Sequence, residues 1–431
     1  MANTVRYCIE LYSIGRLHCV RFIGVFWPRA ARACKRRLWR ARVCRSRRRY
    51  GILHTYFNGL FEQHWHLYTC AGSLTLTLRI RGRAALRIWR RTPDSGQTLL
   101  HEQEIADRAE IALPRDTPHF RQAGLLWFDL TAFDGPIILQ DADWSTSGEG
   151  SGAGQPPARL GVVICTFNRE AALGAVLTAI VGDEGLLTSV ARITVVNQGW
   201  PGLVAQPSIS AAAARLGPKL RVVEQANLGG AGGFGRGLVE ALDDQAVTHV
   251  CFLDDDVRVR PESLRRMAAS FTLAQDDVAL GGHMLDSVRP TTLYEAGAVV
   301  LPNWAPKPLH YGLDLSRPKT LDALLDPYAM HYNGWWMFGF PKRWIDRVGM
   351  PPALLHTRRR HRVWPPPARG RAAHRGHARH RGLARAVLPQ DRRLAALMSC
   401  ACTILRAPFS GSACCPWRRS ADLRGSWLAL S

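Results

Sequence analysis

The chain has 431 residues, which is enough for two or three domains with a sizeable core, and its formal net charge is +23. The excess positive charge lies at the ends. Residues 1–49 contain 14 basic side chains and one acid, and residues 356–431 contain 16 arginines, no lysine and two acids. The remaining residues 50–355 carry 27 basic and 31 acidic side chains, so this body is mildly acidic. The distribution argues against a body that binds nucleic acid, which would need a basic surface.

The two ends differ in composition from folded protein. Residues 353–431 combine Arg, His, Pro, Ala and Gly, and no carboxylate occurs between Asp346 and Asp391. A GC-rich gene that is read in the wrong frame gives this composition. We therefore predict that residues 353–431 are out of frame and disordered, and that residues 1–49 are disordered or out of frame as well. A genuine basic tail that binds nucleic acid is the alternative, and its affinity would fall steeply with salt.

The cysteines and the apolar segments bear on the cellular compartment. Eleven cysteines follow no disulfide framework, and those of the body, Cys70, Cys165 and Cys251, are expected to be buried thiols in a reducing compartment. No segment is typical of a membrane span or a signal peptide. We expect a cytoplasmic protein. Peripheral attachment to the inner face of the cell membrane and assembly into a homo-oligomer are left open.

Residues 50–144 show the period-two alternation of β-strands. Leu74–Ile80 and Ala85–Arg90 alternate apolar and polar side chains, and three further short apolar runs follow with Gly, Pro and Asp between them. Short strands at close spacing predict an antiparallel β-sandwich. Residues 145–157 are rich in Ser, Gly and Pro, and we predict a linker there.

After the linker the pattern changes to alternating strands and helices, over residues 158–352. Leu160–Phe167 is a continuous apolar run, which is typical of a buried parallel strand, and an amphipathic helix follows to about Val181. Further strands are expected at 193–197, 220–223 and 249–254, with a helix that ends near Leu242 between the last two. This order predicts an α/β fold with a Rossmann-like parallel sheet, whose ligand binds beyond the carboxyl ends of the strands.

Two polar stretches lie at those expected strand ends. Asp254, Asp255 and Asp256 directly follow an apolar strand, and adjacent carboxylates persist where a cation neutralises them. The alternative is an acidic helix N-terminus, because Pro261 opens a helix soon after. The glycine-rich stretch 227–237 suits close approach to a diphosphate, and it could equally be a flexible entry to a helix.

In combination, these motifs resemble a known enzyme family. The Thr-Phe-Asn-Arg strand end, the Asn-Leu-Gly-Gly stretch and the three aspartates, in this order, are similar to the nucleotide-sugar-binding half of family 2 glycosyltransferases. Gly281–Leu285 and Tyr332–Trp336 resemble the bacterial galactofuranosyltransferases that use UDP-galactofuranose. The resemblance covers about residues 54–352. It implies a GT-A type transferase domain, preceded by a β-sandwich, that takes a UDP-sugar donor and a glycan acceptor and no nucleic acid.

The resemblance also implies roles for individual residues. Asp254 and Asp256 are expected to hold Mg²⁺ or Mn²⁺, which would stabilise the departing UDP as a Lewis acid. Trp335 and Trp336 are expected on the acceptor side, although two tryptophans after a glycine could equally be core. Asn197 stands where the family has an Asp near the uracil, and its amide oxygen could still accept from the base. The residues expected to contact the nucleotide sugar are Thr166, Arg169, Asn197, Asn227, Gly229, Gly230 and Asp255.

The resemblance stops near residue 352, before the paired acids that supply the catalytic base of the family. An inverting transferase needs such a base within reach of the acceptor hydroxyl. No catalytic residue is therefore assigned, and we predict an inverting glycosyltransferase that is inactive or slow as written. The alternative is a non-catalytic protein that binds nucleotide sugars or carbohydrate.

Overall fold

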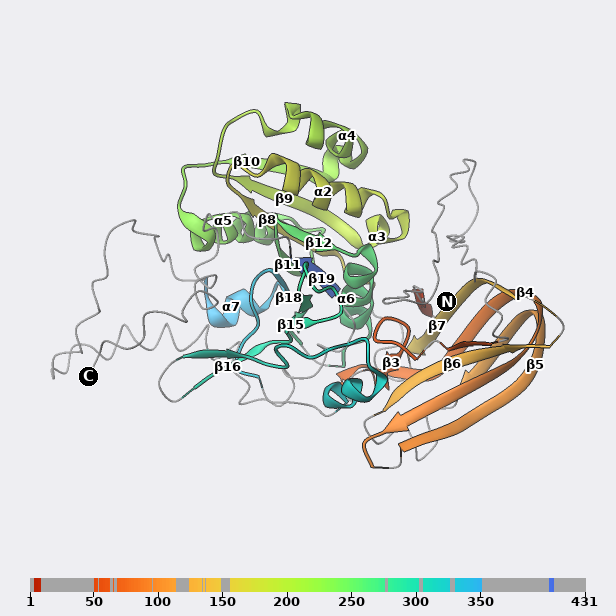
Figure 1. The fold of residues 1–431 in the computed structure, drawn as a ribbon. Coiled ribbons are helices and arrows are strands. Elements are labelled where there is room, and N and C mark those ends of the chain that lie inside the picture. Colours follow the sequence, from red (N-terminus) through yellow and green to blue (C-terminus); the bar gives the residue numbers. More distant parts are fainter. Residues whose placement is uncertain are drawn as a thin grey trace.

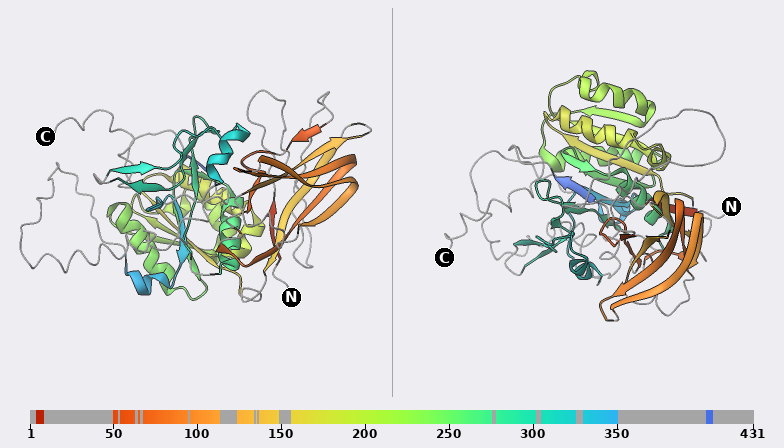
Figure 2. Two further views of the ribbon diagram at one scale, coloured as in Figure 1. Left: turned by 90° about the horizontal axis from the view of Figure 1, so that it is seen from below. Right: turned by 45° about the vertical axis from the view of Figure 1, so that its right-hand side comes forward.

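The computed structural model shows an antiparallel sheet followed by an α/β domain (Figure 1). Within the α/β domain, helices lie against a central sheet, while the antiparallel sheet stands beside it (Figures 1 and 2). The residues that the structure describes are 4–8, 50–52, 54–62, 65, 68–94, 96–113, 124–133, 135, 137–148, 156–275, 278–301, 305–325, 330–350 and 403–406. The segments predicted to be disordered or out of frame, 1–49 and 353–431, lie outside the described residues except for 4–8 and 403–406.

The first sheet has seven strands, and its neighbouring strands run antiparallel, as predicted. The path is β1-β7-β4-β6-β2, while β3 pairs with β6 and β5 pairs with β4. In β4 the expected alternation is observed, because Leu74, Leu76, Leu78 and Ile80 are buried and the residues between them are not. The strands are β1 (Thr4–Cys8), β2 (Tyr50–Ile52), β3 (Leu60–Phe61), β4 (Ala71–Thr92), β5 (Gly96–Leu113), β6 (Leu125–Ala132) and β7 (Ile138–Gly148).

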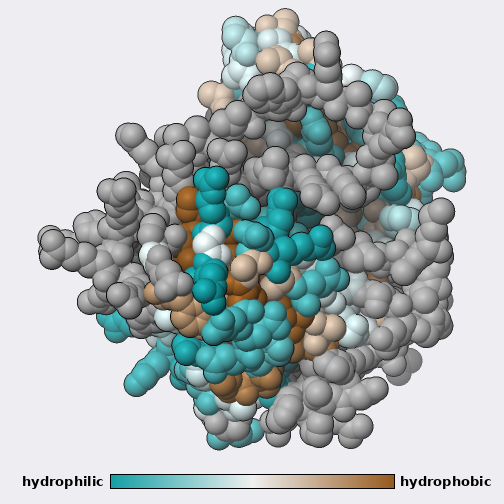
Figure 3. All heavy atoms as spheres, turned by 90° about the vertical axis from the view of Figure 1, so that its right-hand side faces the viewer, coloured by the Kyte–Doolittle hydropathy of each residue, from teal (hydrophilic) through white to brown (hydrophobic). Residues whose placement is uncertain are grey.

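The long strand β4 pairs with three other strands of this sheet, β5, β6 and β7. Its first half pairs with β7 and its second half with β6, while β5 follows it along the other edge. The change of partner occurs near Gly82, whose φ of 107° only glycine adopts readily. The described strands therefore form one bent sheet that turns a mostly hydrophilic face to solvent (Figure 3).

The predicted linker begins later than the composition indicates. β7 continues to Gly148, and Thr146 pairs with Leu74 in the ladder. The Thr146 hydroxyl also donates to the Ser73 carbonyl oxygen at 3.1 Å. Ser and Thr are compatible with a strand when a neighbour supplies the ladder, so residues 145–148 belong to the sheet.

The second sheet is the centre of the α/β domain, and its strand order is β10-β9-β8-β11-β18-β13. β10, β9, β8 and β11 pair in parallel, whereas β18 runs antiparallel to both of its neighbours, β11 and β13, so the sheet is mixed. All seven residues of β8 are buried, as expected for a strand with both faces covered. The strands are β8 (Leu160–Thr166), β9 (Val190–Asn197), β10 (Leu220–Glu224), β11 (His249–Asp254), β13 (Leu280–Gly281) and β18 (Met337–Pro341).

Helices cover both faces of this sheet, which confirms the predicted α/β fold. Val162 and Ile164 of β8 face the cluster that contains apolar residues of α2, α4 and α6, whereas Val163 and Cys165 face the cluster around α5. The helices are α2 (Glu170–Val181), α3 (Glu184–Ser189), α4 (Pro207–Leu216), α5 (Gly229–Asp243), α6 (Pro261–Leu273) and α7 (Trp344–Val348), with 3₁₀ turns η3 (Leu203–Ala205), η4 (Gly217–Lys219) and η5 (Pro318–Leu324).

Short strands complete the domain. One small sheet has the order β12-β19-β14-β15, and β16 pairs with β17. β1 and β19 come from the two segments that we predicted to be disordered, so in these two places the structure has strands instead. Both contain β-branched residues, which favour strands. The bounds are β12 (Val257–Val259), β14 (His283–Leu285), β15 (Leu293–Glu295), β16 (Ala298–Val300), β17 (Pro306–Pro308) and β19 (Thr403–Arg406).

Main-chain hydrogen bonds join the two parts of the molecule. The Cys70 amide donates to the Leu273 carbonyl oxygen at 2.7 Å, and the Gln275 amide donates to the Tyr68 carbonyl oxygen at 3.1 Å. Nearby, an apolar cluster combines residues of both parts: Tyr56, Phe61, Leu125 and Trp127 pack with Leu285, Leu293, Ala296, Leu315, Leu321, Leu324 and Leu325. We call this set the junction cluster. The antiparallel sheet is therefore fixed to the α/β domain.

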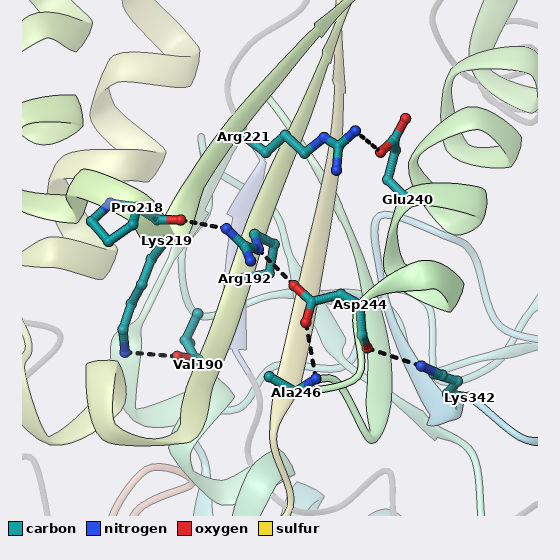
Figure 4. Close-up of polar contacts among 9 residues, drawn as sticks. All are labelled: Val190, Arg192, Pro218, Lys219, Arg221, Glu240, Asp244, Ala246 and Lys342. Atoms are coloured by element: carbon teal, nitrogen blue, oxygen red, sulfur yellow. Dashed lines mark hydrogen bonds and ion pairs between the residues drawn. The ribbon is translucent and has the colours of Figure 1, made fainter.

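Charged side chains close the amino edge of the central sheet (Figure 4). Arg192 of β9 donates to Asp244 at 2.7 Å, and the Lys342 ammonium donates to the Asp244 carbonyl oxygen at 2.9 Å. Lys219 donates to the Val190 carbonyl oxygen at 2.8 Å, and burial, followed by the nearby Arg159, lowers its pKa. These contacts attach the connecting loops to the amino ends of the strands. The carboxyl edge of the sheet stays available for a ligand.

The described cysteines are buried thiols, as expected. Cys70, Cys165 and Cys251 are buried, and no disulfide joins them. Burial raises the pKa of the Cys251 thiol to about 12, so this group stays protonated at neutral pH. Among the described helices, none combines the length and the apolar character that a membrane crossing requires.

Candidate functional site

The carboxyl edge of the central sheet brings several predicted residues together. Register pairs Thr166 at the end of β8 with Asn197 at the end of β9, and Asn197 with Glu224 at the end of β10. Asp254 ends β11 and pairs with Cys165, the neighbour of Thr166. Because parallel strands end on the same side of a sheet, these side chains line one edge. The Thr166 hydroxyl is buried there and has no hydrogen-bond partner in the described part of the chain.

The three aspartates lie at this edge, in and just after β11. The Asp254 amide donates to the Trp336 carbonyl oxygen at 3.1 Å, which places the loop before β18 beside them. Arg169, which directly precedes α2, forms an ion pair with Asp256 and lies 4.0 Å from Asp255. The side chains of this pair are mostly buried, at 15% and 12% exposure. Asp255 is almost fully buried, so its carboxylate depends on nearby positive charge.

The donor set at this edge fits a hard divalent cation in part. Asp254 and Asp256 supply carboxylate oxygens, which Mg²⁺ and Mn²⁺ prefer, and the Arg169 guanidinium shows that Asp256 accepts a cation. Over the described ranges, no group of three or more His, Cys, Asp or Glu side chains is arranged to hold a metal ion. Two carboxylates are the usual protein share of a site that is completed by substrate phosphates and water.

The glycines of the 227–237 stretch serve two purposes. Gly229 has a φ of 70°, and its amide donates to Asn227 Oδ1 at 3.0 Å, so Asn227 fixes the turn into α5. A Cβ on Gly233 would lie 2.1 Å from Cys165 Sγ, and one on Gly237 would lie 2.2 Å from Val163 Cγ1. These two glycines therefore allow α5 to pack closely on β8. Gly230 is buried in the first turn of the helix, which begins at the carboxyl edge.

Gln198 was not predicted, and it connects three elements of the site. Its amide nitrogen donates to the Gly229 carbonyl oxygen at 3.1 Å and to Cys165 Sγ at 3.0 Å. Its amide oxygen accepts from the Leu228 amide at 2.8 Å and from the Gln225 side chain at 3.0 Å. The residue is 4% exposed. Its position directly after an apolar strand is the signal that could have identified it.

Asn197 is buried, and its amide is fully engaged with its neighbours. The nitrogen donates at 2.7 Å both to Glu224 Oε2 and to the Trp200 carbonyl oxygen, and the oxygen accepts from the Gly199 amide at 3.1 Å. Neither Glu224 nor Trp200 was predicted from the sequence. Direct contact between Asn197 and a base stays a prediction, and the arrangement indicates a supporting role.

The two adjacent tryptophans lie in an aromatic cluster. Trp336 is 5% exposed, and its indole nitrogen donates to Glu295 Oε1 at 3.3 Å. Trp335 is half-buried, with ring centroids 5.1 Å from Phe252 and 5.8 Å from Phe234. These packing contacts favour the core alternative for Trp336, while Trp335 retains an accessible part. Their contact with an acceptor stays a prediction, and the segment that would follow them with the catalytic base lies outside the described residues.

Two family models match the chain. Residues 29–147 match the model described as galactofuranosyltransferase 2 N-terminal, and residues 156–334 match glycosyltransferase like family 2. The chain is 30% identical over 323 residues to the galactofuranosyltransferase GlfT2 of Mycobacterium tuberculosis, covering 70% of this chain and 49% of that protein. It is 29% identical over 316 residues to GlfT2 of Mycolicibacterium smegmatis, covering 70% and 48%. The chain therefore spans about half the length of the curated relatives it matches.

Solved structures are less similar. The mannosyltransferase PcManGT from Pyrobaculum calidifontis, in complex with GDP-Man and Mn²⁺, is 19% identical with a TM-score of 0.30, covering 46% of this chain and 50% of that one. Glucosyl-3-phosphoglycerate synthase from Mycobacterium tuberculosis is 14% identical with a TM-score of 0.27, covering 44% and 59%. At these TM-scores the structural likenesses add nothing to the family assignment.

Proposed function

Because the chain belongs to the family 2 glycosyltransferases and shares both matched regions with galactofuranosyltransferases, we propose that it transfers galactofuranose from a UDP-sugar to a hydroxyl group of a glycan acceptor. The observation that carries the proposal is the carboxyl edge of the sheet. There, Arg169 and the aspartates at the end of β11 lie on the same edge of the sheet as the glycine-rich start of α5, which supports a site for a nucleotide diphosphate.

In this proposal, different residues of the carboxyl edge bind the metal ion and the diphosphate. Asp254 and Asp256 would hold Mg²⁺ or Mn²⁺, which would neutralise charge that develops on the departing UDP. The Arg169 guanidinium would turn from Asp256 to the diphosphate oxygens, since an arginine fork binds phosphate well. Asn227, Gly229 and Gly230 keep the backbone at the start of α5 open to the phosphates.

The proton of the acceptor hydroxyl needs a base, and none is assigned. No carboxylate occurs between Asp346 and Asp391, the stretch in which the family resemblance implies one. We therefore propose that this chain binds its donor and transfers sugar slowly or not at all. A non-catalytic protein that binds nucleotide sugars is the second candidate, and this missing base favours it. A cytoplasmic location, attachment to the inner membrane face and homo-oligomer formation stay predictions.

A transfer assay with the full chain tests the proposal. The purified protein is incubated with UDP-galactofuranose, Mn²⁺ and a galactan-type acceptor, while binding of UDP is measured in parallel by calorimetry. We expect binding of UDP that depends on Asp254, with turnover at most a small fraction of that of a complete relative. The Asp254→Asn variant should lose the effect of metal on UDP binding. A wild-type chain that binds no UDP with Mn²⁺ present would contradict both candidates.

A further inference from the structure

The amide of Asn197 holds two groups in place at the carboxyl edge. One acceptor is the carboxylate of Glu224 at the end of β10, and the other is the carbonyl oxygen of Trp200 in the loop after β9. The amide oxygen accepts from Gly199, which fixes which way the amide faces. An aspartate at position 197 would direct negative charge at two acceptors. The structure therefore explains why this position carries Asn and places the available carboxylate on the next strand.

Both residues that Asn197 binds are exposed to solvent. The Trp200 side chain is 72% exposed, the largest value among the exposed aromatic residues described, and Glu224 is exposed as well. In the described part of the chain, the structure assigns Glu224 one hydrogen bond, from Asn197 to Oε2. Its other carboxylate oxygen can accept from a ligand.

The Trp200 loop is also tied to the diphosphate side of the edge. The Trp200 amide donates to Asn168 Oδ1 at 3.1 Å, and Asn168 has a φ of 51°, an unusual value for a residue other than glycine. A Cβ on Gly199 would lie 2.2 Å from the same oxygen atom, so the loop is tightly seated. Asn168 is the neighbour of Arg169, which reaches Asp256. The loop after β9 is thus bonded to the segment after β8, which carries the expected phosphate contact Arg169.

From this arrangement we infer that Trp200 and Glu224 recognise the base of the donor nucleotide, with Asn197 as the residue that positions them. The inference rests on the proposed function. The Trp200 indole offers a face on which a base stacks, and the free oxygen of Glu224 accepts the imide N–H of uracil.

The chemistry of Glu224 selects among bases. A carboxylate accepts and cannot donate, and cytosine and adenine present a ring nitrogen acceptor where uracil presents its N–H. Guanine also presents a ring N–H, so the selection by Glu224 is against cytosine and adenine. At this ring position Glu224 therefore favours a uridine nucleotide over cytidine and adenosine nucleotides.

Competition among nucleoside diphosphates tests the inference. Dissociation constants of UDP, CDP, GDP and ADP are measured by calorimetry with Mn²⁺ for the full chain and its variants. For the wild type we expect UDP to bind at least about tenfold more tightly than CDP, as for a site that hydrogen-bonds a specific N–H. In Glu224→Gln the amide can donate to cytosine, so the ratio should fall to within about threefold.

One further variant separates stacking of the base from selection among bases, and another serves as a control. Trp200→Ala removes the stacking face, so all four affinities should fall by about tenfold while the ratio of UDP to CDP is kept. Glu184→Gln is the matched control, because this exposed glutamate lies in α3, before the amino end of β9, and the ratio should not change. Glu224 is exposed, so its variant should melt at the wild-type temperature.

The outcomes separate this inference from the proposed function. If Glu224→Gln keeps the wild-type ratio of UDP to CDP, the base is read elsewhere and the inference is overturned, while the proposed function stands. If the wild-type chain binds none of the four nucleotides, the proposed function itself fails. A reduced ratio in Glu224→Gln together with an unchanged ratio in Glu184→Gln supports the inference.

Discussion

The Arg169 guanidinium forms an ion pair with Asp256, one of the two aspartates that are expected to hold the metal. A cation that is part of the protein thus occupies a carboxylate that the metal needs. In the proposed site the two cations would compete for Asp256 in the absence of nucleotide, and the diphosphate would relieve the competition because it offers Arg169 another anion. Metal and nucleotide should therefore bind with positive coupling.

This competition predicts a gain of metal affinity in Arg169→Ala. The variant should bind Mn²⁺ alone more tightly, by about threefold to tenfold, because Asp256 loses its resident cation. The same variant should bind UDP more weakly. Electron paramagnetic resonance of free Mn²⁺ measures the first effect without any turnover. Arg159→Ala, at the amino end of β8, is the control, and equal Mn²⁺ affinity in both variants would remove Asp256 from the metal site.

A buried polar contact of Tyr56, a residue of the junction cluster, predicts a large effect of one hydroxyl. Tyr56 and His283 Nδ1 are hydrogen-bonded at 2.7 Å across the two parts of the molecule, and both residues are buried. Tyr56→Phe leaves the imidazole nitrogen without this partner, so we expect a loss of about 1–3 kcal/mol in the free energy of unfolding. Urea unfolding measures it. Tyr311→Phe, at an exposed tyrosine, should change stability by less than about 0.5 kcal/mol.

Stability should fall in mild acid. Burial lowers the pKa of His283 to about 3, and burial followed by the Arg91 charge lowers the pKa of His54 to about 4. An unfolded histidine takes up its proton near pH 6.5, so below that pH the unfolded state binds more protons than the folded state. The free energy of unfolding therefore decreases as the pH falls from about 6.5 toward 3, and His283 alone contributes about 2 kcal/mol by pH 5.

A variant without the imidazole isolates this effect. Glu62 acts in the opposite direction, because burial raises its pKa to about 7 and the folded state then binds its proton first. His283→Gln is less stable at pH 7 and should show a smaller decrease between pH 7 and pH 5 than the wild type. Urea midpoints at the two pH values give the comparison, and parallel decreases would mean that His283 does not titrate as its burial implies.

Two glycines of α5 should respond oppositely to the same substitution. Gly233→Ala places a methyl group against Cys165 Sγ and within 3.0 Å of the Gln198 amide, so it should cost about 1–3 kcal/mol and weaken UDP binding. Gly235→Ala meets no atom within 4 Å and should stabilise the helix by about 0.5–1 kcal/mol. Thermal melting of both variants checks this. Equal effects would show that α5 does not pack on β8 as closely as described.

The sequence predicts the parts of the molecule that periodicity controls. Apolar runs identify β8, β9 and β11, and alternation identifies β4, because burial on two faces or on one face leaves a distinct pattern. The aspartates are predicted correctly at a strand end for the same reason. The linker boundary is missed, since Ser and Thr in β7 carry no apolar signal and only the neighbouring β4 shows that they belong to a strand.

The hydrogen bonds among strand ends could not be predicted from the sequence. Gln198 contacts Gly229 across 31 positions, and Asn197 contacts Glu224 across 27, so no local pattern records either pair. Which side chain extends to a neighbouring strand depends on register, which only the folded sheet sets. The same holds for Trp336, which a Gly-Trp-Trp motif alone could not place in the core.

The union of the antiparallel sheet with the α/β domain has a consequence for dissecting the protein. Because the junction cluster draws apolar side chains from both parts, neither part has a complete core alone. A polypeptide cut between residues 148 and 156 should yield two fragments that aggregate separately and reassemble when they are co-expressed. The two regions therefore form a single cooperative folding unit, and truncation is a poor way to isolate the transferase activity.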